Sequence, residues 1–253
     1  MTGKPCTITV NPRPYPAVLV CLPFAGAGAG FFRQWDPLAP AGLTILPVQL
    51  PGREERYADA PLTSVEQAVN DVLPWVIGKL AVRGGTPSRI GLFGHSLGAE
   101  LAFELSRLLT ARGVPITRLL VSGAPGPRDR CVERVSHLDD DAFLEGLRRV
   151  SGYRHAAMDH SELLPLMMPY LRADNAMHED YWAAHSELLA VPITSLRGRD
   201  DHLVSAARAA QWAAETTREF RAVEITGGHM YLTAKCHARE LLRTISSELE
   251  RSE

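Results

Sequence analysis

A serine between two glycines is the first sign of chemistry in this 253-residue chain. The segment Gly94-His95-Ser96-Leu97-Gly98 follows the apolar run 89–94 and precedes a helical pattern. A G-x-S-x-G sequence in that position is typical of a nucleophile elbow, a sharp turn that lifts the serine hydroxyl above a sheet edge. Free N–H groups at the start of the following helix favour developing negative charge. We therefore predict that Ser96 is a nucleophile and that the Leu97 N–H binds an oxyanion.

A serine hydroxyl is a weak nucleophile unless a base takes its proton, and the partners of such an elbow follow in the order acid, then histidine. Among nine histidines, His229 directly follows the last apolar run, after two glycines that let the chain turn. The acid should follow the preceding run, where Asp200 and Asp201 stand, while Asp129 follows an earlier run. The G-x-x-D spacing from Gly198 favours Asp201, so Ser96, Asp201 and His229 are the expected catalytic residues.

A second oxyanion donor is expected in the glycine-rich loop after the first apolar run. Its small residues let backbone N–H groups approach a ligand closely. Phe24 or Ala25 would supply the donor; we favour Phe24 and expect Ala25 to contact substrate. The loop lacks the GK[ST] of a phosphate-binding loop. No metal is expected, because His178 and His185 are not in HExxH spacing and no other cluster has ligand spacing.

Short apolar runs alternate with helix-period segments along most of the chain. Because the runs are apolar on both faces and are followed by Gly or Pro, they predict strands of a mostly parallel sheet covered by helices on both sides. The expected strands are 17–24, 43–50, 89–94, 118–125, 192–198 and 221–226. The expected helices are 64–80, 97–112, 204–215 and 231–249. This order predicts a doubly wound α/β fold.

One region breaks the alternation. About sixty residues between the strands 118–125 and 192–198 lack a strand pattern and predict three helices, over 139–152, 161–174 and 179–190. A helical insertion at the carboxyl ends of the strands lies where ligands bind in such folds. We therefore predict a core in two parts, 1–126 and 191–253, and a helical lid over 127–190.

Composition and charge narrow the function classes. The net charge of −2 predicts no general attraction to nucleic acid or to an anionic membrane. No stretch approaches the apolar length of a membrane-spanning helix, and the first residues lack the apolar segment of a signal peptide. The four cysteines are far apart, with no CxxC pair, which indicates reduced thiols and a cytoplasmic protein.

Five motifs together resemble the type II thioesterases, the stand-alone editing enzymes of polyketide and nonribosomal peptide synthesis, within the α/β-hydrolase superfamily. They are LVCLPFAGAGAGFFRQW, VQLPGREERY (48–57), FGHSLGAELAFEL, LPLMMPYLRAD (164–174) and GGHMYL, and they span nearly the whole chain. Leu97 stands where the family often has Met, but only its backbone N–H is needed there. Met230 stands where the family usually has Phe, which would alter the shape of an acyl pocket.

The resemblance implies an α/β-hydrolase fold and a reaction without a cofactor. Ser96 would attack an acyl thioester on the phosphopantetheine arm of an acyl or peptidyl carrier protein while His229 takes its proton. Asp201 would orient the imidazole, and the Phe24 and Leu97 N–H groups would hold the oxyanion. The enzyme is expected to be a monomer. The alternatives are a general esterase or peptidase, a catalytically silent binding protein, and an acyltransferase onto an alcohol or amine.

Two surfaces are expected to contact the substrate. Met167 and Met168 of the lid could line an acyl channel, because Met side chains fill irregular space, or could only pack the lid onto the core. Carrier proteins of this kind are usually acidic, as the resemblance implies, so a local basic patch should attract them. Candidate patches, each of which could instead be a solvated face, are Arg128, Arg130 and Arg134, and the pair at 148–149.

Overall fold

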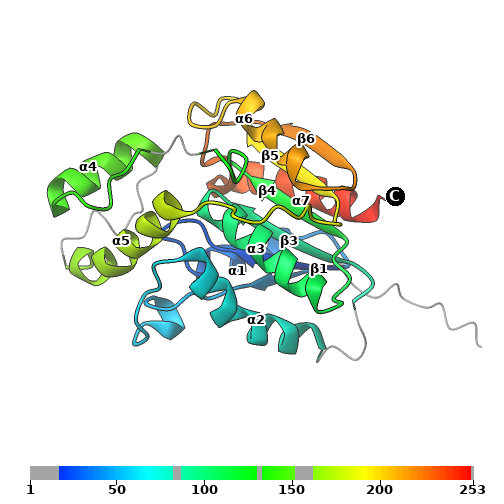
Figure 1. The fold of residues 1–253 in the computed structure, drawn as a ribbon, viewed down its shortest axis with the longest axis horizontal. Coiled ribbons are helices and arrows are strands. Elements are labelled where there is room, and N and C mark those ends of the chain that lie inside the picture. The colour runs from blue at the N-terminus through cyan, green and yellow to red at the C-terminus, as the bar shows by residue number, and fades with distance from the viewer. Residues whose placement is uncertain (1–16, 82–86, 130–132, 152–161, 252–253) are drawn as a thin grey trace, which may run out of the picture.

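The computed structural model of this chain describes residues 17–81, 87–129, 133–151 and 162–251. Its fold is built around one β-sheet (Figure 1). Its six strands are all parallel and lie in the order β2-β1-β3-β4-β5-β6. They are β1 (Ala17–Leu22), β2 (Leu43–Pro47), β3 (Ile90–His95), β4 (Arg118–Ser122), β5 (Ile193–Gly198) and β6 (Phe220–Ile225). All six expected strands and the parallel α/β fold are confirmed.

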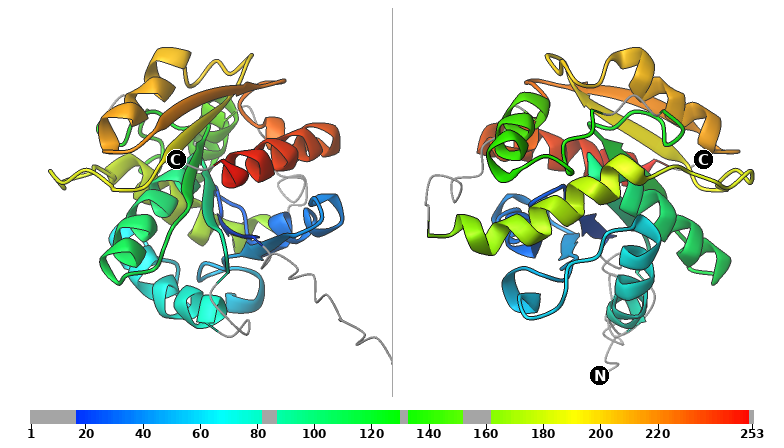
Figure 2. Two further views of the ribbon diagram at one scale, coloured as in Figure 1. Left: turned by 90° about the vertical axis from the view of Figure 1, so that its right-hand side faces the viewer. Right: turned by 60° about the vertical axis from the view of Figure 1, so that its left-hand side comes forward.

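Helices cover both faces of the sheet, which is why its central strands are apolar throughout. The helices α2 (Val65–Ala81) and α3 (Leu97–Ala111) pack on the face that carries Val18 and Val20 of β1. The short α1 (Ala29–Arg33) and the long α7 (Lys235–Glu250) pack on the opposite face, against Leu19 and Cys21. Figure 2 (left) shows the two pairs on opposite sides of the sheet. The sequence did not predict α1, which begins inside the glycine-rich run.

Helix ends follow local chemistry. The Ser64 hydroxyl accepts the Gln67 N–H at 3.2 Å at the start of α2, as its position before the helical pattern predicts. Gly113 follows α3 with φ +75°, the left-handed conformation expected of a C-terminal glycine. The α-helix expected over 204–215 is shorter in the structure. Ser205 caps its start, α6 spans Ala206–Ala210, and the 3₁₀ helix Gln211–Glu215 follows directly. The described residues also contain the 3₁₀ helices Asp36–Leu38, Glu54–Arg56 and Tyr231–Thr233.

The insertion between β4 and β5 contains α4 (Asp140–Ser151) and α5 (Leu164–Asp180), which lie at one end of the molecule (Figure 1). The prediction of a third helix in the insertion, over 179–190, is wrong, because α5 ends at Asp180 and no helix follows it in the described residues before β5. The chain leaves α5 at Tyr181 in an extended conformation. Arg128 then binds the carbonyls of Ala183 and His185, at 3.2 and 2.5 Å, and Leu189 pairs with Thr216. These long-range bonds take up backbone groups that a helix would need.

No helix among the described residues is long and apolar enough to cross a membrane.

Candidate active site

Ser96 occupies the turn between β3 and α3. Its φ and ψ are 51° and −123°, a conformation that costs an L-residue about 1–3 kcal/mol. A Cβ on Gly94 would lie 1.8 Å from the Gly98 carbonyl oxygen, and a Cβ on Gly98 would lie 2.5 Å from that of Leu22. The two glycines are therefore required for strand and helix to approach this closely. The turn has the geometry of a nucleophile elbow.

His229 lies in the loop after β6 and is hydrogen-bonded to a buried carboxylate. Its Nδ1 is 2.9 Å from Oδ2 of Asp201, whose side chain is fully buried. The other oxygen, Oδ1, accepts the N–H groups of Leu203 at 2.8 Å and Val204 at 3.0 Å. Burial alone would raise the pKa of Asp201, but the His229 bond and charge and these two N–H groups outweigh it and lower the pKa. The carboxylate is thus held ionised against one ring nitrogen of His229.

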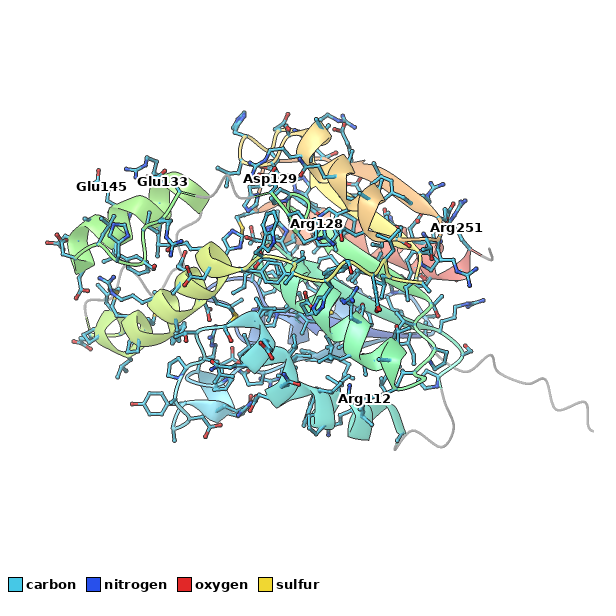
Figure 3. All side chains as sticks on the ribbon, in the orientation of Figure 1. Arg112, Arg128, Asp129, Glu133, Glu145 and Arg251 are labelled. Carbon is cyan, nitrogen blue, oxygen red and sulfur yellow. The ribbon has the colours of Figure 1, made fainter. Side chains whose placement is uncertain are left out.

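The rival acids lie elsewhere. Asp129, which is labelled in Figure 3, binds Arg208 through two bonds, Nε to Oδ2 at 2.8 Å and Nη2 to Oδ1 at 3.1 Å. Asp200 is exposed, and its backbone N–H donates to the Gly227 carbonyl at 2.9 Å. Of the three aspartates considered from the sequence, Asp201 is the one hydrogen-bonded to His229.

His95 links the histidine loop to the elbow. The rings of His95 and His229 lie 4.8 Å apart, and His95 directly precedes Ser96 in the chain. The structure therefore brings Ser96, His229 and Asp201 to one edge of the sheet. Burial, and secondarily the charge of His229, lowers the pKa of His95 well below its usual value, so this ring stays neutral. Its Nδ1 lies 2.8 Å from the hydroxyl of Ser122.

The glycine-rich loop turns beside the same site. The Ala27 N–H donates to the Phe24 carbonyl at 2.9 Å, which closes a turn over 24–27 in which Gly26 has φ +81°. The buried Phe24 ring stands edge-on to His95, with centroids 6.0 Å apart. Leu97 begins α3, where N–H groups lack intrahelical acceptors. Both expected oxyanion residues thus flank the elbow.

The family can now be assigned. The family model described as thioesterase domain matches residues 17–249. This chain belongs to the thioesterase family. Thioesterase PikA5 of Streptomyces venezuelae is 37% identical to it over 98% of this chain and 89% of that protein.

Solved structures share the fold over more than nine-tenths of this chain. The type II thioesterase BorB from the borrelidin biosynthetic cluster is 32% identical and superposes with a TM-score of 0.78, covering 94% of this chain and 92% of BorB. ClbQ from the colibactin NRPS/PKS pathway is 25% identical, with a TM-score of 0.83 over 93% of this chain and 97% of ClbQ. The α/β-hydrolase fold and the resemblance to type II thioesterases drawn from the sequence are confirmed.

Met167 and Met168, which the sequence placed in the expected lid of this thioesterase, are both buried between α4 and α5. Met167 is 5% exposed and Met168 is 9% exposed, in a cluster with Phe143, Leu147 and Leu171. Met167 also lines a cavity of about 280 Å³ next to the 24–27 turn, together with residues 26, 28 and 52–54. This position suits an acyl-contacting role for Met167, and Met168 serves the packing of the two helices. That either one contacts an acyl chain stays a prediction.

Met230 follows His229 and is half-buried against the cluster that covers the α7 face of the sheet. Its effect on an acyl pocket also stays a prediction.

The described members of the expected basic patch, Arg128 and Arg134, are both ion-paired. The Arg128 guanidinium binds Glu215, Nε to Oε1 at 2.9 Å and Nη2 to Oε2 at 3.1 Å, and two backbone carbonyls of the 181–190 segment (Figure 3). Arg134 is paired with Asp180. Arg130 lies outside the described residues. Arg128 therefore holds the extended segment in place and is not a free docking charge.

Further polar side chains, which the sequence did not single out, lie around the loops that carry Ser96 and His229 in this thioesterase. Arg53 of the PGRE motif and Asp174 of the LRAD motif form a buried ion pair beside the 24–27 turn. The Ser122 hydroxyl, which lies against His95, is also 2.6 Å from the Tyr231 hydroxyl. The motifs marked Arg53 and Asp174 as family features, but nothing local shows that residues this far apart meet.

Within the described part of the chain, no group of three or more His, Cys, Asp or Glu side chains could hold a metal ion.

Proposed function

We propose that this thioesterase hydrolyses acyl thioesters with Ser96 as nucleophile, His229 as general base and acid, and Asp201 as the residue that orients the imidazole. The observation that carries the proposal is the 2.9 Å bond from His229 to the buried Asp201, beside a strained serine elbow. The Asp201 carboxylate holds a proton on Nδ1 of His229, which leaves Nε2 free to accept a proton.

The reaction has two halves. Ser96 Oγ attacks the thioester carbonyl while His229 takes its proton, the carbon–sulfur bond breaks, and the imidazolium protonates the leaving thiolate. Water then attacks the acyl-Ser96 ester while His229 accepts a proton from the water, the bond between the acyl carbon and Ser96 Oγ breaks, the imidazolium returns the proton to Oγ, and the free acid leaves. Leu97 and Phe24 donate N–H groups to the oxyanion in both halves. The Gly26 and Ala27 N–H groups already bind Asp174 and Phe24, which supports a donor earlier in that loop.

The substrate we propose is an acyl group on the phosphopantetheine arm of an acyl or peptidyl carrier protein. The similarity to PikA5, to BorB and to ClbQ from an NRPS/PKS pathway supports this choice. Removal of stalled or wrong acyl groups from a polyketide or nonribosomal peptide synthase would be the biological role. The insertion 127–190 acts as the lid over the acyl chain, and the enzyme works as a cytoplasmic monomer. Nothing observed favours a general esterase or peptidase.

A serine-directed probe tests the nucleophile. A fluorophosphonate should label the wild-type enzyme covalently and leave Ser96→Ala unlabelled, because the hydroxyl that reacts is absent. Ser205→Ala is the matched control, since Ser205 only caps α6 through the Arg208 N–H at 3.3 Å. Labelling of Ser96→Ala at the wild-type rate would refute the assignment.

A comparison of substrates tests the partner. Turnover of an acyl group on a phosphopantetheinylated carrier protein should give a higher kcat/KM than the same acyl group on N-acetylcysteamine or as a p-nitrophenyl ester. Equal values for the carrier-bound and the free substrates would favour a general esterase.

A further inference from the structure

Arg53 and Asp174 form a buried ion pair that no catalytic step uses. Their side chains are 5% and 0% exposed. Two parallel bonds of 2.6 Å join them, Nη1 to Oδ2 and Nη2 to Oδ1. Removing two charges from water carries a large free-energy cost, so a buried pair is weak evidence for a role in stability alone. The pair therefore calls for a more specific explanation.

Apart from a 3.4 Å bond from Arg53 Nε to the Pro51 carbonyl, the other side-chain hydrogen bonds of the pair are made to one turn. Asp174 Oδ2 accepts the Gly26 N–H at 2.8 Å, and Arg53 Nη1 donates to the Ala27 carbonyl at 3.0 Å. Gly26, at the third position of the 24–27 turn, has φ +81°, the value of a type II turn. Type I and type II turns differ mainly by a flip of the central peptide. The bond to Asp174 therefore fixes the Ala25–Gly26 peptide in one of two orientations.

The helix α5 touches the turn at a second point. A Cβ on Gly26 would lie 2.8 Å from Cδ2 of Leu171, one turn before Asp174 on α5. The Tyr170 ring covers the Arg53 guanidinium at 4.6 Å. The turn is thus held by groups from α5 and from the loop after β2 together.

From these contacts we infer that Arg53 and Asp174 are positioning residues for the oxyanion hole. This inference rests on the proposed role of the Phe24 loop in binding the oxyanion. They hold the 24–27 turn in the shape that lets the Phe24 N–H donate to the oxyanion formed at Ser96. Because Asp174 belongs to the proposed lid, seating of α5 also completes the oxyanion hole. Neither residue touches the reacting atoms.

The variant Asp174→Asn tests this role. With its oxygen toward the Gly26 N–H, the amide points its NH₂ group at Arg53 Nη2 and loses the ion pair; in the opposite orientation it points the NH₂ group at the Gly26 N–H and loses the bond to the turn. Loss of one oxyanion donor typically lowers kcat by about 10²–10³, and a displaced donor should cost about 10–100-fold. We expect that fall in kcat on an acyl-N-acetylcysteamine thioester, with KM unchanged within about twofold.

Two inhibitors separate a positioning role from a structural one. A trifluoromethyl ketone forms a tetrahedral adduct with the serine, so its affinity should fall by the same factor as kcat/KM. A thioether analogue has no carbonyl oxygen, and its affinity should stay at the wild-type value. Asp71→Asn is the matched control, because Asp71 pairs with Arg56 of the same motif on the surface and does not touch the turn. It should leave kcat and both affinities unchanged.

The outcomes that would overturn the inference are distinct from those that would refute the proposed function. An unchanged kcat in folded Asp174→Asn, or equal losses of affinity for both inhibitors, would overturn it. If that variant does not fold, Arg53→Lys takes its place, because an ammonium keeps the charge but cannot form both bonds to Asp174 and reach Ala27. Failure of both variants to fold would also overturn it, by showing that the pair holds the whole fold. The proposed nucleophile is tested separately, by inhibition of the wild-type enzyme.

Discussion

Replacing Asp201 with Asn should change the tautomer of His229 without changing the shape of the site. Oδ1 of Asp201 accepts two backbone N–H groups, from Leu203 and Val204. The oxygen of an Asn side chain must take that place, because an NH₂ group there would face two donors. Its NH₂ group then faces Nδ1 of His229, where the carboxylate oxygen now lies at 2.9 Å. Nδ1 becomes an acceptor, the proton moves to Nε2, and Nε2 can no longer accept the proton of Ser96.

The expected magnitude follows from that tautomer. In serine triads of this geometry the wrong tautomer lowers kcat by about 10⁴-fold, which corresponds to about 5 kcal/mol of transition-state stabilisation. The Asn side chain is isosteric and keeps the bonds to both N–H groups, so the melting temperature should change by only a few degrees.

The assay is hydrolysis of an acyl-N-acetylcysteamine thioester near neutral pH, with thiol release recorded and the melting temperature measured on the same samples. Asp200→Asn and Asp129→Asn are the matched controls, because Asp200 is exposed and Asp129 binds Arg208. Both controls should stay within about tenfold of wild type, since neither aspartate contacts the imidazole. An Asp201→Asn variant with more than a tenth of wild-type activity would refute the reasoning. Loss of activity in Asp129→Asn instead would move the acid to that residue.

Gly98→Ala should destabilise the fold by about 1–3 kcal/mol in urea unfolding, because the new Cβ meets backbone at 2.5 Å, whereas Gly78→Ala in α2, with nothing within 4 Å, should stabilise it by about 1 kcal/mol. Equal effects of the two would contradict the packing argument. Burial alone would lower the pKa of His178, but the Glu100 carboxylate outweighs it and raises the pKa above 6.5. The protonated ring therefore stabilises the fold below about pH 6.5, and this contribution fades as pH rises through the raised pKa. His178→Gln should consequently lower the unfolding free energy more at about pH 6 than at about pH 9; a pH-independent difference would contradict this. Arg128→Ala leaves the 3% exposed Glu215 without its partner and should destabilise the fold by about 2 kcal/mol, less than for a fully buried pair because Arg128 is 38% exposed. It should reduce turnover of carrier-bound and small thioesters alike, and a selective effect on the carrier-bound substrate would revive a docking role.

The sequence by itself determined the strands, the sheet type and the elbow. A strand such as 17–22 is apolar on both faces, so both faces must be covered by other elements. Because this pattern lies within a few consecutive residues, the sequence alone predicts a parallel sheet with helices on both sides. The glycine before Ser96 is local too, because the contact that Gly94 permits is with Gly98, four residues on, whereas Gly98 permits a contact with the Leu22 carbonyl of β1. The order of acid and histidine narrowed the partners of Ser96 to a few residues.

Only the tertiary structure decided which side chains meet. It selected Asp201, because the choice depends on where the loops after β5 and β6 come together. It turned the segment after α5 from an expected helix into an extended chain, since Arg128 and Thr216 bind its backbone from elsewhere. Arg53 and Asp174 are 121 positions apart, and neither has a nearby residue that signals the other. Local patterns encode elements, whereas pairs between distant elements form only when packing sets their positions, and packing involves the whole chain at once.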